Sequence, residues 1–263
     1  MKRRYSLLVY ALILYLFLYL PIMLVVIFSF NETNSQSSFE GFSFKWYEAL
    51  FENERVLSAA RNSLVVATLS AILATFLGTL LAFGMWRYHF RGKGILEAFL
   101  HIPLVLPEVV MGISFLLFFS LLGLRLSLLT VILSHVTFAL PYAALVVRSQ
   151  LEQYDTTLED AARDLGASPL EVLGKVTLPI LMPGIAAAVL LSVILSLDDV
   201  VISFFVSGVR GMTLPVKIFS MVRAGVKPDI NALSTLMLIG TFLLALGAKK
   251  LFEHFESRRT LVK

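Results

Sequence analysis

Long apolar runs separated by polar stretches dominate the hydrophobic pattern of this chain. A helix needs about 20 apolar residues to cross a bilayer, and six runs approach that length. They predict helices over residues 6–28, 64–86, 98–122, 128–147, 180–203 and 232–248. The predicted fold class is therefore an all-α integral membrane protein with six transmembrane helices.

Three polar segments between these runs are long enough to form structure of their own. Residues 31–62 and 207–231 lie on one side of the predicted membrane, and residues 148–179 lie on the other. Internal repeats and low-complexity tracts are absent. We therefore predict a single transmembrane domain over residues 1–263.

The 148–179 segment has the pattern of two short helices joined by a glycine turn. Thr156 and Glu159 predict a capping box that opens the first helix, and Gly166 tolerates the left-handed conformation that ends it. The apolar positions of the first helix follow helical spacing at Leu158, Ala161, Ala162 and Leu165. So short a helix is unstable alone, so it either packs on the chain's own membrane ends or lies in a groove of a partner.

The second helix of this segment has its own start and stop signals. Ser168 precedes Pro169, and Glu171 stands where a capping-box partner of Ser168 belongs. Pro179 predicts that the helix ends before it, because proline lacks a backbone donor. The segment is therefore predicted to be a compact two-helix projection.

Composition agrees with a membrane protein, and charge orients it. The chain is 58% hydrophobic and only 15% charged, with a mean hydropathy of +0.85. Fourteen of the 22 Lys and Arg lie on the side of the 148–179 segment and both termini, which the positive-inside rule makes cytoplasmic. The absence of cysteine excludes thiolate metal sites and cysteine nucleophiles.

Two adjacent carboxylates, Asp198 and Asp199, interrupt the fifth apolar run. Counted with Glu97 at the start of the third run, the acidic and histidine residues of the six runs are Glu97, His101, Glu108, His135, Asp198 and Asp199, and no Lys or Arg lies inside the runs. Each carboxylate near a helix centre costs about 2.5–3.5 kcal/mol on insertion scales. We expect no base within the chain to compensate these acids, so they should face a cavity, a partner or a cation.

Helical geometry predicts where these acids lie. At 1.5 Å per residue, Glu108 is about 20 Å from Ile95, near the inner end of its span, and Asp198 is about 22 Å from Pro183. The acids can therefore lie at one level. Asp199 shares a polar stripe with Ser192, Ser196 and Ser203. Asp198 lies roughly 100° round the helix, so we expect one aspartate to line a path and the other to face its border.

Prolines and aromatic residues add to this picture. Pro103 and Pro107 predict a break in the third run just before Glu108, as in the discontinuous helices of transporters, although a kink without function is the alternative. Trp46 and Tyr47 either stack a cation at the extracytoplasmic entrance or form part of an interfacial belt.

The remaining ionisable residues of the runs receive structural interpretations. Glu97 is expected to pair with Lys93, four residues before it. His101 and His135 are interpreted as hydrogen-bonded packing residues rather than ligands.

The 148–179 segment resembles the "EAA" loop of ABC importer permeases. The matching positions are Asp160, Ala161, Ala162, Gly166, Val176, Leu178 and Pro179, with Asp replacing Glu and Val replacing Ile. The resemblance implies that these residues, with Glu159, couple the chain to a cytoplasmic ATPase that binds ATP and Mg²⁺. The chain itself is then not an enzyme, in keeping with Pro169 and Val176 standing where a P-loop around Gly174-Lys175 needs Gly and Ser or Thr.

A wider resemblance, to the permeases of spermidine/putrescine ABC importers, runs almost end to end. It rests on "EGFSFKWY" at 40–47, "WRYHFRGK" at 86–93, "LPEVVMGISFLLFFSLLGL" at 106–124, "SLDDVVISFFVSG" at 196–208 and "LPVKIFSMVRAGVKPDINAL" at 214–233. It implies a type I importer permease of a bacterial inner membrane, whose path is lined by Glu108, Asp198, Asp199, Ser196, Trp46 and Tyr47.

This resemblance also implies the partners. They are a homologous second permease, two copies of the ATPase and an extracytoplasmic polyamine-binding protein. An ABC permease for another solute is the alternative within transport. An autonomous cation channel or exchanger is the alternative outside it, but it leaves the EAA-like segment unexplained.

Overall fold

The structure is a computed structural model that describes residues 2–35, 38–225 and 227–260, with side chains described over 7–250 of these. Within these residues the regular secondary structure is helical, apart from one isolated bridge between Asn31 and Phe42, and loops and turns join the helices. The α-helices are α1 (Lys2–Phe28), α2 (Lys45–Glu52), α3 (Glu54–Arg87), α4 (Lys93–Val105), α5 (Glu108–Leu121), α6 (Leu128–Leu151), α7 (Thr157–Asp164), α8 (Pro169–Val172), α9 (Leu178–Asp198), α10 (Val201–Val206), α11 (Leu214–Arg223) and α12 (Pro228–Thr260).

The helices long and apolar enough to cross a membrane match the predicted runs. Among the described residues, five qualify alone: 7–28, 54–87, 128–151, 169–198 and 228–250. The pair α4 and α5 qualifies as a sixth span bent by 112° at its break. The prediction of six spans is confirmed, whereas the prediction of one domain stays a prediction. Lys263, counted among the cytoplasmic charges, lies outside the described residues.

The chain divides into two compact units. One comprises Met1–Ser58 with Lys217–Leu246, and the other Ala59–Val216 with Gly247–Lys263. In the first unit, Asn31 organises the loop after α1, because its amide nitrogen donates to the carbonyls of Ser35 and Ser38, both at 2.9 Å. The rings of Phe30 and Phe42 stack at 5.0 Å. This loop leads directly into α2, which carries Trp46 and Tyr47.

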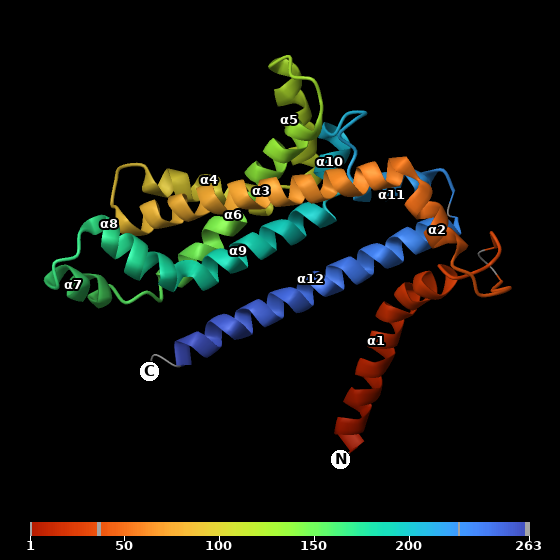
Figure 1. Ribbon diagram of the computed structural model, residues 1–263, viewed down its shortest axis with the longest axis horizontal. Helices are drawn as coiled ribbons and strands as arrows, with labels where there is room; N and C mark the ends of the chain where they lie inside the picture. The colour runs from red at the N-terminus through yellow and green to blue at the C-terminus, as the bar shows by residue number, and fades with distance from the viewer. Residues whose placement is uncertain (1, 36–37, 226, 261–263) are drawn as a thin grey trace. The chain divides into compact units, whose positions relative to one another are not determined.

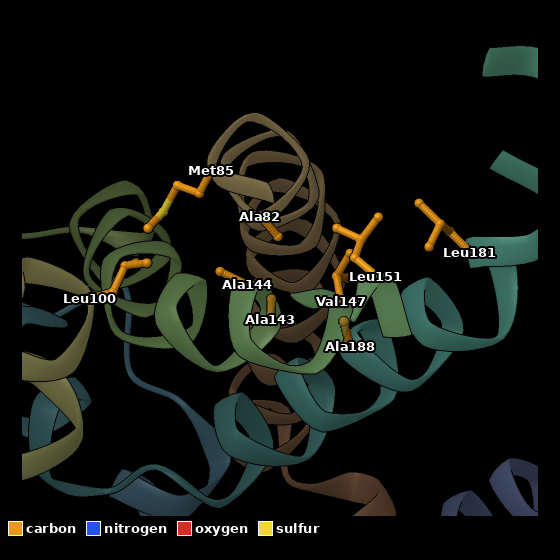
Figure 2. Packing of buried hydrophobic residues seen from close by; sticks show 9 residues of the cluster. All are labelled: Ala82, Met85, Leu100, Ala143, Ala144, Val147, Leu151, Leu181 and Ala188. Atoms are coloured by element: carbon orange, nitrogen blue, oxygen red, sulfur yellow. The ribbon is translucent and has the colours of Figure 1, made fainter. Parts of the chain in front are cut away.

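The core of the second unit is built on small residues. α6 packs along α9 (Figure 1). A buried cluster of residues from α3, α4, α6 and α9 contains Ala82, Met85, Leu100, Ala143, Ala144, Val147, Leu151, Leu181 and Ala188 (Figure 2). A Cβ at Gly78 of α3 would lie 2.9 Å from the backbone nitrogen of Ala144. Small residues at these crossings let helix backbones approach closely, as is usual between membrane helices.

Residues 148–179, the predicted cytoplasmic segment, contain the two predicted helices, with two corrections. Gly166 has φ +87° after α7, and the Ser168–Glu171 capping box opens α8, both as predicted. Thr156 makes no side-chain cap to α7; Asp155 does so instead, accepting from the Thr157 amide at 3.0 Å and the Thr157 hydroxyl at 2.7 Å. These bonds lower the pKa of the Asp155 carboxyl.

The second correction concerns Pro179. The helix that begins at Pro169 does not end before it, but continues through a π-helical stretch, Leu173–Thr177, into α9. Wider π-turns change the hydrogen-bond register of a helix, and Pro179 then falls in the first turn of α9, where its missing donor costs little. The cytoplasmic segment is thus continuous with the fifth span.

Candidate functional site

The fifth span, expected as one helix over 180–203, breaks at the aspartates. α9 ends at Asp198, and the ψ angle of 119° at Asp199 turns the backbone out of the helix. The Asp199 carboxylate accepts from the amides of Ile202 at 3.1 Å and Ser203 at 2.8 Å. These are the free donors of the first turn of α10, so Asp199 caps this short helix.

His135 of α6 holds the other side of the Asp199 carboxylate. Its Nε2 lies 3.1 Å from Asp199 Oδ2 and 2.9 Å from Ser203 Oγ, and its Nδ1 lies 2.7 Å from Ser196 Oγ. The side chains of His135 and Asp199 are only 2% and 3% exposed. The expectation that the chain offers no base to these acids is therefore wrong for Asp199, and the hydrogen-bonded packing role expected of His135 is confirmed.

The predicted polar stripe forms the interior of this network. Ser192, Ser196, Asp199 and Ser203 are all buried. The Ser70 hydroxyl of α3 donates to Ser196 Oγ at 3.3 Å, so three helices meet at the stripe. Ser196, predicted to line the path, is hydrogen-bonded within the chain to both Ser70 and His135.

The third span breaks as the prolines predict. Leu106 and Pro107 are extended, with ψ near 135°, and Glu108 begins α5 directly after them. The residue before a proline avoids the helical region, which places the break at Leu106–Pro107, while Pro103 remains inside α4. Glu108 lies within electrostatic range of both Asp199 and Asp198.

α5 and α10 pack against each other (Figure 1), with Gly112 at the contact. A Cβ there would lie 2.6 Å from Cδ2 of Phe205 and 3.4 Å from Cα of Ile202. α5 of the third span and α10 of the fifth span therefore meet at one contact. Glu108 lies at the break of the third span, and Asp198 and Asp199 lie at the break of the fifth.

Asp198 differs from its neighbour in having its carboxylate exposed. Within the described part of the chain, no hydrogen bond or ion pair engages the carboxylates of Asp198 and Glu108. Asp199 is satisfied internally, whereas these two acids are available to an external group.

Trp46 and Tyr47 belong to the other compact unit, so their role in a path stays a prediction. Trp46 Nε1 donates to the carbonyl of Asn31 at 2.7 Å, and the Tyr47 hydroxyl lies 2.7 Å from Ser29 Oγ. The Lys45 ammonium lies 4.7 Å from the centre of the Trp46 ring. The ring therefore already carries one cation contact.

Glu159 anchors the cytoplasmic segment to the spans. Its carboxylate, with a side chain only 4% exposed, lies 3.2 Å from Arg87 at the end of α3 and 2.7 Å from Arg163. It also accepts from the Thr177 hydroxyl at 3.0 Å. Sequence reasoning missed Arg87 and Thr177, because their approach to Glu159 depends on how α3 and α9 pack.

The outer face of α7 is open. Asp160, Ala161, Gly166 and the first residues of α9, Leu178 and Pro179, are exposed, and Ala162 is half-buried. Leu165 and Leu170 are 89% and 80% exposed. Exposed leucines beside small residues form a surface suited to a protein partner.

Glu97 has a different partner from the one predicted. Its carboxylate pairs with Arg148 of α6 at 3.1 Å, because α4 packs on α6, and this replaces the expected Lys93. His101 Nδ1 lies 2.6 Å from the carbonyl oxygen of Glu97 in its own helix, and the residue is exposed, so its packing role stays a prediction.

Comparison with known proteins identifies the family. The model of the "Binding-protein-dependent transport system inner membrane component" family matches residues 74–260, more than two thirds of the chain. The chain belongs to this family. It is therefore a multi-pass inner membrane transport component.

Individual relatives agree with this assignment. The permease is 42% identical over 236 residues to the spermidine/putrescine transport system permease protein PotC of Escherichia coli K12, covering 90% of this chain and 89% of that protein. It is 41% identical over 250 residues to the putrescine transport system permease protein PotI of the same organism, covering 92% and 89%.

A solved structure shows the same fold. One chain of a bacterial alginate ABC transporter, solved with an alginate-bound periplasmic protein, superimposes with a TM-score of 0.73 at 19% identity. The superposition covers 94% of this permease and 92% of that chain.

Proposed function

We propose that this permease is a subunit of an ATP-driven ABC importer for the polyamines spermidine and putrescine, and that it forms half of the translocation path. The observation that carries the substrate class is the pair of exposed, unpaired carboxylates, Asp198 and Glu108, at two neighbouring helix breaks. The names of the relatives PotC and PotI support the same class.

The chemistry of a polyamine suits this arrangement. Its ammonium groups are separated by methylenes, so it pairs with carboxylates that are spaced apart and lie beside apolar surface. Asp198 and Glu108 bind the ammonium groups, while Asp199 stays bound to His135. Trp46 and Tyr47 offer aromatic faces at the extracytoplasmic entrance.

The proposed partners are supported by the exposed face of α7 and by membership of the binding-protein-dependent transport family. The exposed face of α7, with Asp160, Ala161 and Gly166, docks on one of two cytoplasmic ATPases that bind ATP and Mg²⁺. Glu159 joins this face to the ends of α3 and α9. A homologous second permease completes the path, an extracytoplasmic binding protein delivers polyamine, both termini are cytoplasmic, and this chain performs no catalysis.

Uptake of labelled spermidine by the reconstituted complex tests the proposal. Native complex should take up spermidine only with ATP, and Asp198→Asn and Glu108→Gln should each lower uptake about tenfold or more, because each removes a charge-assisted hydrogen bond. Glu97→Gln is the matched control, since this acid of the third span pairs with Arg148, and it should stay near native.

The other outcomes overturn the proposal in distinct ways. Uptake without ATP would indicate a channel or exchanger. Absence of spermidine uptake by an assembled native complex would assign the path to another solute. Full uptake by both Asp198→Asn and Glu108→Gln would remove these acids from the path.

A further inference from the structure

α10 is a six-residue helix attached to α6 at both ends. At its start, His135 contacts Asp199 and Ser203. At its end, the Thr130 hydroxyl donates to the carbonyl of Val206 at 2.7 Å. So short a helix has little stability of its own, so its position depends on these two contacts and on packing against α5.

The break in the fifth span also sets the direction of Asp198. Neighbouring residues of a continuous helix point about 100° apart, but here the backbone leaves the helix at Asp199 and resumes at Val201. Asp199 is drawn inward by His135 and by the amides of α10, and Asp198 is left exposed. The inward bonds of Asp199 thus decide which acid faces outward.

We propose that His135 is the positioning residue that holds the break of the fifth span open and keeps Asp198 facing the path, acting through the contact of its Nε2 with Asp199. This inference rests on the proposed function for the meaning of the path, but its geometry can be tested without transport. His135 itself does not touch the substrate.

The hydrogen-bond pattern assigns separate roles to the two ring nitrogens. Ser70 donates to Ser196, which leaves the Ser196 hydroxyl free to donate to Nδ1, and Nε2 then donates to Asp199. The hydroxyl protons of Ser70 and Ser196 and the ring proton of His135 each have an acceptor when the neutral ring carries its proton on Nε2. Among the described residues, the charged group in contact with the ring is Asp199; Asp198 adjoins it in sequence, and Glu108 of α5 lies within electrostatic range of both acids. From α3, the Ser70 hydroxyl joins the network through Ser196.

Two substitutions separate these roles. The amide nitrogen of glutamine is three bonds beyond Cβ, as Nε2 is, whereas that of asparagine is two bonds beyond Cβ, as Nδ1 is. His135→Gln therefore keeps a donor for Asp199, and His135→Asn leaves this buried carboxylate short of one partner. Ser134→Ala is the control, because the hydrogen bond that the described residues give the buried Ser134 hydroxyl goes to Thr130 O of its own helix.

Thiol labelling reads the geometry directly, because the chain contains no cysteine. Asp198→Cys is introduced into the assembled complex and labelled with a cationic methanethiosulfonate reagent. The labelling rate should be equal with His135, His135→Gln and Ser134→Ala, and about tenfold lower with His135→Asn, the factor expected for one lost charge-assisted hydrogen bond. Equal rates in all four backgrounds would overturn the inference.

A second measurement and a second variant keep the test decisive. In chains that retain Asp198, His135→Asn should raise the spermidine concentration for half-maximal uptake about tenfold, and His135→Gln should restore it. If His135→Asn does not assemble, Ser196→Ala replaces it, because this change removes the Nδ1 partner and the acceptor of the Ser70 hydroxyl but leaves the contact of Nε2 with Asp199 in place. Labelling should then stay native, and a tenfold fall in the labelling rate would contradict the role of Nε2.

The labelling and uptake results also separate this inference from the proposed function. A labelling difference without any spermidine uptake by the native complex would retain the positioning role and reject polyamine as the substrate. Loss of uptake in Asp198→Asn together with identical labelling in all His135 backgrounds would retain the proposed function and reject the positioning role of His135.

Discussion

Removal of the Glu159 charge should loosen the cytoplasmic segment far more than removal of the neighbouring Asp160 charge. Both acids pair with Arg163 at 2.7 Å, but the Glu159 side chain is 4% exposed and that of Asp160 is 68% exposed. Glu159 also bonds Arg87 and Thr177. The two positions therefore share a partner and differ in burial.

The magnitude follows from that difference. Breaking a buried ion pair by removing one partner costs about 3–5 kcal/mol, and the lower end applies here because Arg87 and Arg163 are about one third exposed and regain water. Glu159→Ala should thus cost about 3 kcal/mol. Asp160→Asn removes an exposed pair and should cost less than about 1 kcal/mol.

Hydrogen exchange on the assembled complex measures this effect locally. Amides of α7 and of the 168–178 stretch should exchange about a hundredfold faster in Glu159→Ala, the factor equivalent to about 3 kcal/mol, and little faster in Asp160→Asn. ATP-dependent uptake should fall in parallel. Equal exchange in the two variants would refute the reasoning that burial makes Glu159 the anchor.

Three further predictions concern pH and glycine. Hydrogen bonds from Ser168 and Lys175 lower the pKa of Glu171 to about 2. The stabilisation of α8 by Glu171 is therefore complete above the ordinary pKa of 4.5 and is lost as the pH falls toward 2. Hydrogen exchange of the α8 amides, corrected for chemical rate, should show this loss in the native chain and not in Glu171→Gln. Gly166→Ala should destabilise the 148–179 segment by about 1 kcal/mol, because Gly166 has a φ of +87°. Gly174→Ala, where a Cβ meets open space, should stabilise the segment by about 0.5–1 kcal/mol. Thermal unfolding measures both changes. Gly112→Ala should force α5 away from Phe205 and lower uptake more than Gly240→Ala, which meets no neighbouring atom; equal uptake would exclude the α5–α10 contact from transport.

Local sequence signals were sufficient for much of this permease. Apolar run length predicted the spans, because a bilayer requires about 20 apolar residues whatever the tertiary contacts. Pro103 and Pro107 predicted a break before Glu108, because proline lacks a backbone donor, and the structure places that break at Leu106–Pro107. Gly166 and the Ser168–Glu171 capping box marked the helix ends within a few residues.

Only the tertiary structure decided which acids are free. Helical geometry predicted that the adjacent Asp198 and Asp199 face different ways without deciding which of them is free, but His135, far away in sequence, satisfies Asp199 alone. The Arg87–Glu159 and Arg148–Glu97 pairs likewise join helices whose packing no local pattern encodes. A buried charge takes whichever partner the packing brings within hydrogen-bond reach, and sequence spacing reveals that partner only when both residues lie on the same helix.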